Sequence, residues 1–187
     1  HIQPGTLCLG SPSPISGRQL MKKLLTIAIS AALASGSTQS LVVQDAIIKA
    51  QNTQTIVNQV GYTLLGSLSD TDGDGYMEAP NILNKGTDGG QLPLSLAAPK
   101  SDGYGTALKY CAFDNGSVRT NANLIQGSNT PSPANTTFAV ISAGSDKTFN
   151  TTCADIYVSG IATADDIAFV STQSQAATGT AQNTPQY

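Results

Sequence analysis

The sequence predicts an α+β domain in which a long N-terminal helix packs on a four-stranded antiparallel β-meander. Between residues 40 and 66 apolar side chains recur at steps near three and four, and no proline interrupts 21–79. That period indicates an amphipathic helix. Farther along, short apolar runs alternate with turns rich in Gly, Asp and Ser, which is typical of consecutive strands. The expected strands are 107–114, 136–143, 148–157 and 165–171.

The segment before this helix allows two interpretations. Residues 1–20 hold three prolines and no periodicity, which indicates a leader or an upstream extension. Met21-Lys22-Lys23, an apolar run at 24–34 and the triplet Ala32-Leu33-Ala34 form the three parts of a signal peptide, cleaved after Ala34. Alternatively, one helix runs from about Leu24 to Ser67 and is retained. The helix at 40–66 is expected in both cases.

A connection at 69–106 follows the helix and begins with a motif typical of calcium loops. Asp70, Asp72 and Asp74 alternate, Gly75 comes next, and Glu78 lies beyond Tyr76. In a curled loop this spacing directs carboxylates inward, with a backbone carbonyl (here that of Tyr76) between them. The residue that would complete an EF-hand is Asn81, so the motif resembles isolated calcium loops of exported proteins. The alternative is a hydrated acidic turn.

The cysteines indicate an oxidising compartment. Cys8 lies in the leader, and Cys111 and Cys153 lie in or beside expected strands. In an exported chain such a pair forms one disulfide, worth about 3–4 kcal/mol on the chain-entropy model. Here it would tie the first strand to the third. The alternative is two buried free thiols.

Composition argues against several classes of function. Only 11% of the residues are charged, and the net charge is −3, which leaves no basic surface for nucleic acid. The one histidine is His1, so a histidine base inside a folded site is not expected. Since the sequence also lacks a GxSxG elbow and a Cys-x-x-Cys pair, we expect no enzyme. The polar tail at 172–187 is expected to be flexible in isolation.

Three phrases of the second half carry a family resemblance. They are DGYGTALKYCAFDNG at 102–116, FAVISAGSDKTF at 138–149 and ADDIAFV at 164–170. Their order and wording resemble the C-terminal sheet of type IV pilins and of type II secretion pseudopilins. The resemblance implies a filament subunit whose stem helix packs in the filament core and supports a pilin-like sheet. It also implies a second calcium site at Asp146, Asp165 and Asp166.

We therefore expect a structural subunit of an extracellular, pilus-like filament, with copies of itself as partners and calcium as its cofactor. If the N-terminal helix is retained, the inner membrane holds the chain before assembly. Donor-strand assembly through Leu41-Val42-Val43 is an alternative that the helical period disfavours. A soluble secreted calcium-binding or adhesive module and a minor pilin or pseudopilin are also compatible with the sequence. Sequons for sugar attachment occur at Asn115, Asn135 and Asn150.

Overall fold

The computed structural model describes the backbone of residues 17–132 and 134–178, and side chains from Leu41 onward except at Gln175, Ala177 and Thr178. The chain divides into two units, 1–45 and 46–187. We call the described part of the second unit the head. The leader predicted at 1–20 and the end of the predicted tail lie largely outside the described residues. The choice between a retained helix and a cleaved signal at 21–34 concerns side chains that are not described.

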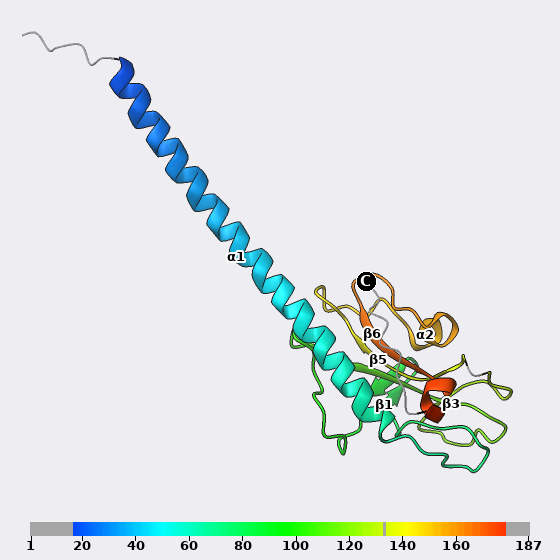
Figure 1. The fold of residues 1–187 in the computed structure, drawn as a ribbon. Helices are drawn as coiled ribbons and strands as arrows, with labels where there is room; N and C mark the ends of the chain where they lie inside the picture. Colours follow the sequence, from blue (N-terminus) through cyan, green and yellow to red (C-terminus); the bar gives the residue numbers. More distant parts are fainter. Residues whose placement is uncertain (1–16, 133, 179–187) are drawn as a thin grey trace, which may run out of the picture. The chain divides into compact units, whose positions relative to one another are not determined.

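Three helices and six strands lie in the described residues (Figure 1). The helices are α1 (Gly17–Leu65), α2 (Cys153–Ser159) and α3 (Gln173–Thr178). The strands are β1 (Leu83–Gly86), β2 (Gly89–Gln91), β3 (Lys109–Asp114), β4 (Ile125–Gln126), β5 (Thr136–Ser142) and β6 (Ile167–Thr172).

The strands form one sheet in the order β1-β2-β3-β5-β6, and the short strand β4 pairs with β3 off this path. Every pair in the main order is antiparallel, whereas β3 and β4 are parallel. In the central register Tyr110 lies opposite Val140, and Val140 lies opposite Phe169. The three longest strands, β3, β5 and β6, therefore lie side by side, with β5 in the middle and β6 at the edge of the sheet.

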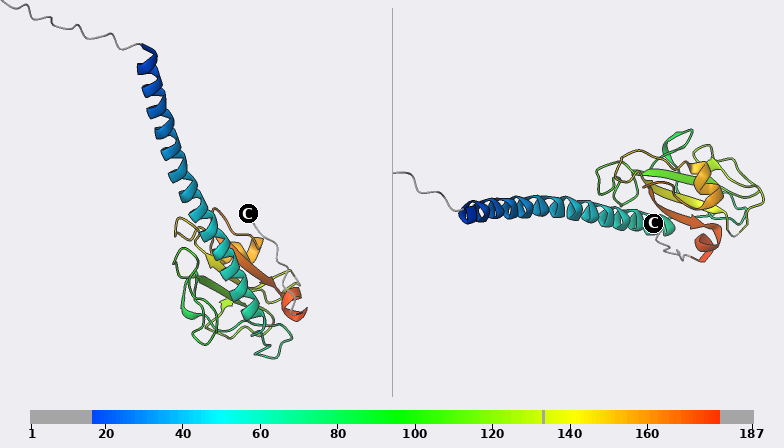
Figure 2. Two further views of the ribbon diagram at one scale, coloured as in Figure 1. Left: turned by 60° about the vertical axis from the view of Figure 1, so that its left-hand side comes forward. Right: turned by 90° about the horizontal axis from the view of Figure 1, so that it is seen from above.

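Both faces of this central sheet are apolar, and each is covered by a helix of the same chain. Tyr110, Val140 and Phe169 belong to the same core cluster as Val57 and Val60 of α1. Their strand neighbours face the other way, where Cys111, Phe113, Ala139 and Ile141 pack with Ile156 of α2. Figure 2 shows the C-terminal part of α1 and α2 on opposite sides of the sheet. The period-two alternation of the strands thus sorts the core into two layers.

The predicted strand at 148–157 is wrong, since its second half forms helix α2. Thr152 caps this helix: its side chain accepts a hydrogen bond from the N–H of Asp155, and the Asp155 carboxylate accepts one from the N–H of Thr152. Gly160 ends the helix in a left-handed conformation. This reciprocal capping box gives the N–H groups of Thr152 and Asp155 partners within the segment itself. In a strand, such N–H groups would need partners on a neighbouring strand. Local capping therefore outweighs the apolar, strand-like composition of the segment.

The predicted fold class is consequently also wrong. Instead of a four-stranded meander the head has six strands, because the predicted connection at 69–106 contains the hairpin β1–β2 and the 115–135 region contributes β4. The helical part with described side chains is short, Leu41–Leu65, and its buried hydrophobic residues Val57, Val60 and Leu64 all lie in its C-terminal half. Strands expected at 107–114, 136–143 and 165–171 match β3, β5 and β6 within two residues.

The predicted disulfide between Cys111 and Cys153 is confirmed, with 5.6 Å between the Cα atoms. It joins β3 to the first residue of α2, and not to a third strand as expected. Both cysteines are buried, and the backbone N–H of Cys153 donates to the carboxylate of Asp88 at 2.6 Å. The bond thus fastens α2 to the face of the sheet that α1 does not cover.

Opening this disulfide should destabilise the head by about 3–4 kcal/mol, because the unfolded chain regains the entropy of a closed loop. The Cys111→Ser, Cys153→Ser double variant should unfold at a lower urea midpoint than wild type under oxidising conditions. With reductant present the two proteins should become closely similar. Equal midpoints without reductant would contradict this role.

A second prediction concerns the contact of α1 with β6. A Cβ added at Gly61 would lie 2.3 Å from the ring of Phe169. Gly61→Ala should therefore destabilise the head by about 1–3 kcal/mol through overpacking, although alanine favours helix by about 1 kcal/mol. Thermal unfolding measures the difference. Gly66→Ala is the control, since its Cβ would meet only the Thr63 carbonyl oxygen at 3.6 Å. Equal melting temperatures of the two variants would refute the contact.

Candidate metal centre

The acidic motif forms a closed loop immediately after α1. Ser69 and Glu78 form an isolated antiparallel bridge, in which each N–H donates to the carbonyl oxygen of the other at 3.1 and 2.9 Å. The bridge brings the start and the end of the motif together. Residues 70–77 therefore curl between two fixed points, as the alternate carboxylate spacing predicted.

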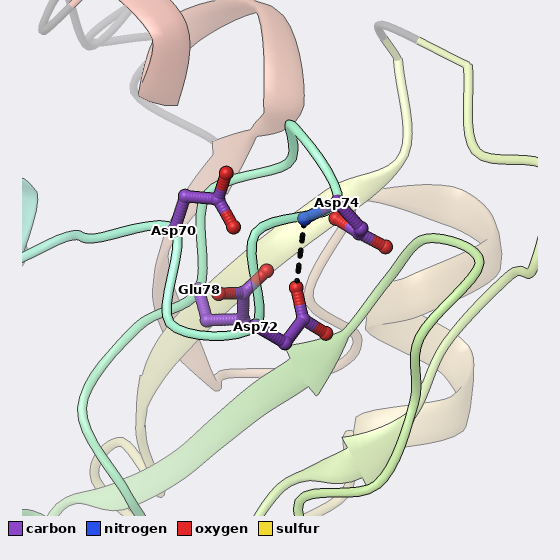
Figure 3. A group of neighbouring side chains, drawn as sticks. All are labelled: Asp70, Asp72, Asp74 and Glu78. Carbon is purple, nitrogen blue, oxygen red and sulfur yellow. Dashed lines mark hydrogen bonds between the residues drawn. The ribbon is translucent and has the colours of Figure 1, made fainter.

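Four carboxylates converge in this loop (Figure 3). Asp70, Asp72, Asp74 and Glu78 each offer one oxygen, and these oxygens lie within 4.8 Å of one another. No other group of three or more potential metal-binding His, Cys, Asp or Glu side chains meets that criterion among the described residues. The structure therefore brings together all four carboxylates that the sequence singled out, and this acidic cluster could hold a metal ion.

Backbone donors orient the first two aspartates of the loop. The Asp70 carboxylate accepts hydrogen bonds from the N–H groups of Gly73 and Gly75, at 2.7 and 3.0 Å. Asp72 accepts one from the N–H of Asp74 at 3.2 Å, shown in Figure 3. Each carboxylate oxygen keeps a lone pair, so these bonds position the oxygens without using up their capacity as ligands.

Glu78 is the buried member of the cluster, with 2% of its surface exposed. Its Oε2 accepts bonds from the N–H and the hydroxyl of Thr71, at 2.7 and 3.0 Å. Its Oε1 is buried and has no hydrogen-bond partner in the protein. A buried carboxylate oxygen without a donor is costly. A cation among the four carboxylates would supply the missing partner.

The electrostatics of the cluster agree with this fit. Burial raises the pKa of Glu78, and the charges of Asp72 and Asp70 add to the effect while Thr71 opposes it. Desolvation also raises the pKa of Asp72, with smaller contributions from neighbouring aspartates. Without a cation, the folded state therefore favours protonated carboxyls, and its stability falls as the pH rises through the raised pKa values. A bound cation would instead favour the ionised carboxylates, because a carboxyl group must lose its proton to bind a metal.

The donor set limits which metals fit. All four side chains are hard oxygen donors, and neither histidine nor cysteine is part of the cluster. Oxygen ligands suit Ca²⁺, Mg²⁺ and Mn²⁺, whereas soft or nitrogen ligands would select zinc or copper. Tyr76, predicted to offer its carbonyl, lies in the loop, and its N–H donates to Asp74 Oδ1 at 3.1 Å. Asn81 is engaged elsewhere, because its Oδ1 accepts from the Asn121 amide at 2.8 Å.

Two contacts of the loop come from distant parts of the chain and were missed by sequence reasoning. The N–H of Val118 donates to Asp74 Oδ2 at 3.2 Å. The buried amide of Gln173 pairs with both backbone groups of Met77, at 3.3 and 3.2 Å. No local motif marks either residue, since separations of 44 and 96 residues leave no pattern in the sequence.

The second predicted site does not gather in this way. Asp165 Oδ2 accepts bonds from the N–H groups of Ser145 and Asp146 and from the Ser145 hydroxyl; these bonds, led by the hydroxyl, lower its pKa. Asp166 Oδ2 accepts from the N–H groups of Asn150 and Thr151, at 2.9 and 2.6 Å. Both carboxylates therefore fasten the 144–151 loop beside β6. A metal at Asp146, Asp165 and Asp166 stays a prediction.

The three sequons lie in different surroundings. Asn115 is fully buried, and its Nδ2 donates to the Thr136 carbonyl at 2.9 Å. Because the side chain is fully buried, a sugar on that nitrogen is incompatible with the folded head. Asn135 is half-buried and Asn150 is exposed. Sugar at these two positions stays a prediction.

Comparison with protein-family models, with curated proteins and with solved structures finds no match in any of the three. Among the described residues, no helix is both long and apolar enough to cross a membrane. The disulfide is compatible with an extracellular or secreted protein. The site therefore has to be interpreted from its own chemistry.

Neutralising the buried carboxylate provides a test of the centre. Glu78→Gln should raise the melting temperature in chelator, because it removes a buried charge beside three others. It should also diminish the stabilisation by added Ca²⁺. When the free Ca²⁺ concentration is about 100 times the Kd, this stabilisation is about 2.7 kcal/mol. Differential scanning calorimetry measures both effects. Asp45→Asn removes an exposed charge outside both candidate sites and should leave the calcium increment unchanged. An undiminished increment in Glu78→Gln would argue against the centre.

Proposed function

We propose that this protein is a structural subunit of an extracellular, pilus-like filament, with a head that calcium and one disulfide stabilise. The observation that carries the proposal is an unusually apolar exposed stretch of α1. Its five large aliphatic residues are 50–71% exposed: Leu41, Val42, Val43, Ile47 and Ile48. Apolar surface of this extent, concentrated within eight residues, is typical of a segment that a partner covers.

Copies of the chain are the partners that this stretch fits best. The last third of α1 buries its own apolar face on the sheet through Val57, Val60 and Leu64. The exposed stretch continues the same helix towards the apolar run at 24–34. Helices with such surfaces bundle side by side, each burying apolar area worth about 25 cal/mol per Å². If the run at 24–34 is retained, it would hold the chain in the inner membrane before assembly.

Calcium is the cation that we assign to the acidic cluster. Calcium accepts six to eight oxygens in flexible geometry, whereas Mg²⁺ demands a near-ideal octahedron and retains its waters. A cluster with four carboxylates and a loop carbonyl supplies many oxygens without octahedral order. Calcium would neutralise the charges that desolvation and mutual repulsion make costly, and so would act as a structural ion with no catalytic role.

The second candidate is a soluble secreted calcium-binding or adhesive module. The acidic cluster favours it, since all four carboxylates lie in the head and need no filament. A minor pilin or pseudopilin is a third assignment within the filament class. The decisive difference is whether the exposed aliphatic stretch is needed for assembly.

Introducing charge into that stretch should separate the candidates. The Ile47→Glu, Ile48→Glu double variant should abolish filaments in electron micrographs of the producing cells, because buried carboxylates oppose helix packing. Both side chains are at least 50% exposed, so the melting temperature of the head should change little. Leu94→Glu, at a residue 80% exposed outside α1, is the control and should still assemble. A wild-type protein that is released as a monomer would favour the secreted module.

A further inference from the structure

The carboxylate of Asp74 joins the acidic loop to a second segment of the head. Oδ1 of Asp74 accepts from Tyr76 within the loop, and Oδ2 accepts from the N–H of Val118 at 3.2 Å. Val118 lies in the connection between β3 and β4. Asp74, a candidate metal ligand, therefore has one oxygen hydrogen-bonded to the loop and the other to the β3–β4 connection.

Gly116 makes this approach sterically feasible. Its φ is +114°, and a Cβ at this position would lie 1.8 Å from Oδ2 of Asp74. No side chain fits into that space without displacing the carboxylate. The absence of a side chain at 116 thus sets where Asp74 can lie.

The connection is itself fastened to the sheet beyond this point. The N–H of Gly116 donates to the Ser128 carbonyl at 2.8 Å, and the Asp114 carboxylate accepts from the N–H of Asn121 at 3.0 Å. Ser117, Val118 and Thr120 between these anchors are exposed. Between these anchors two hydrogen bonds hold the tip: the N–H of Val118 donates to Asp74, and the guanidinium of Arg119 donates to the Gly127 carbonyl at 2.7 Å.

We propose that the turn Gly116–Val118 is the second half of the metal centre, so that calcium binding in the loop also orders the exposed connection between β3 and β4. The proposal rests on the calcium assignment made above. The buried, unpartnered Oε1 of Glu78 indicates independently that the cluster takes a cation. Gly116 and Val118 are positioning residues, which act on the ion through Asp74.

Charge explains the coupling. Without a cation, Asp74 has its ligand oxygen within 4.8 Å of those of three other carboxylates, and their repulsion favours an opened loop. Opening moves Oδ2 away from the N–H of Val118. A bound cation removes the repulsion and fixes Asp74, so the loop and the turn become ordered together. Calcium would thereby control the shape of an exposed surface as well as the stability of the loop.

A matched pair of glycine variants tests this proposal by titration calorimetry with CaCl₂. Gly116→Ala should weaken calcium binding by about 10–100-fold, the usual loss when a group that positions a ligand is changed. Gly105→Ala is the control: its φ is +80°, so it carries similar backbone strain, but a Cβ there meets nothing within 4 Å. It should bind calcium as wild type does. Equal affinities in the two variants would overturn the proposal.

Hydrogen exchange of the wild-type protein gives a measurement that needs no variant. The amide of Val118 should exchange more slowly in calcium than in chelator, whereas the amide of Gly160, which caps α2 by donating to the Ile156 carbonyl, should not change. Calcium binding without protection at Val118 would refute the coupling and leave the calcium assignment intact. Absence of calcium binding to wild type would refute both.

Discussion

The head depends on one constraint, which is that strand β5 is apolar on both faces. All seven of its residues are buried, and an apolar strand in water must be covered on either side. The last third of α1 covers one face, and α2 covers the other. Because α2 has only seven residues, it is too short to be stable alone. Its capping box and the disulfide to β3 therefore hold it in place.

The core also fixes both ends of the acidic loop. The acidic loop is inserted between two parts of the core, with Leu64 before it and Ala79 and Ile82 after it. Just beyond the loop, the hydroxyl of Tyr110 donates to the Pro80 carbonyl at 2.9 Å, which fixes the exit of the loop to β3. Repulsion among the carboxylates consequently acts on a loop whose two ends cannot separate. This confinement keeps the four carboxylates close together, as in a site that could hold a cation.

Sequence reasoning succeeded where the pattern was local. The apolar run at 136–143 predicted β5, and the Asp70-x-Asp72-x-Asp74 spacing predicted the cluster. It failed at 148–157, although Thr152, Asp155 and Gly160 carry a capping signal for a helix there. This missed helix covers the second face of β5. The hairpin β1–β2 was missed because its strands have four and three residues.

By itself, the sequence determined the helix at 41–65, the three longest strands, the disulfide pair and the carboxylates of the loop. Each depends on neighbours a few residues apart, or, for the cysteines, on there being one pair in the head. Only the tertiary structure decided that α2 covers the second face, that Glu78 is buried with an unpartnered oxygen, and that Gly116 and Val118 lie against Asp74. These depend on contacts between distant parts of the chain, such as the separation of 44 between Val118 and Asp74. Such contacts form only when the whole core is packed, and no local pattern encodes them.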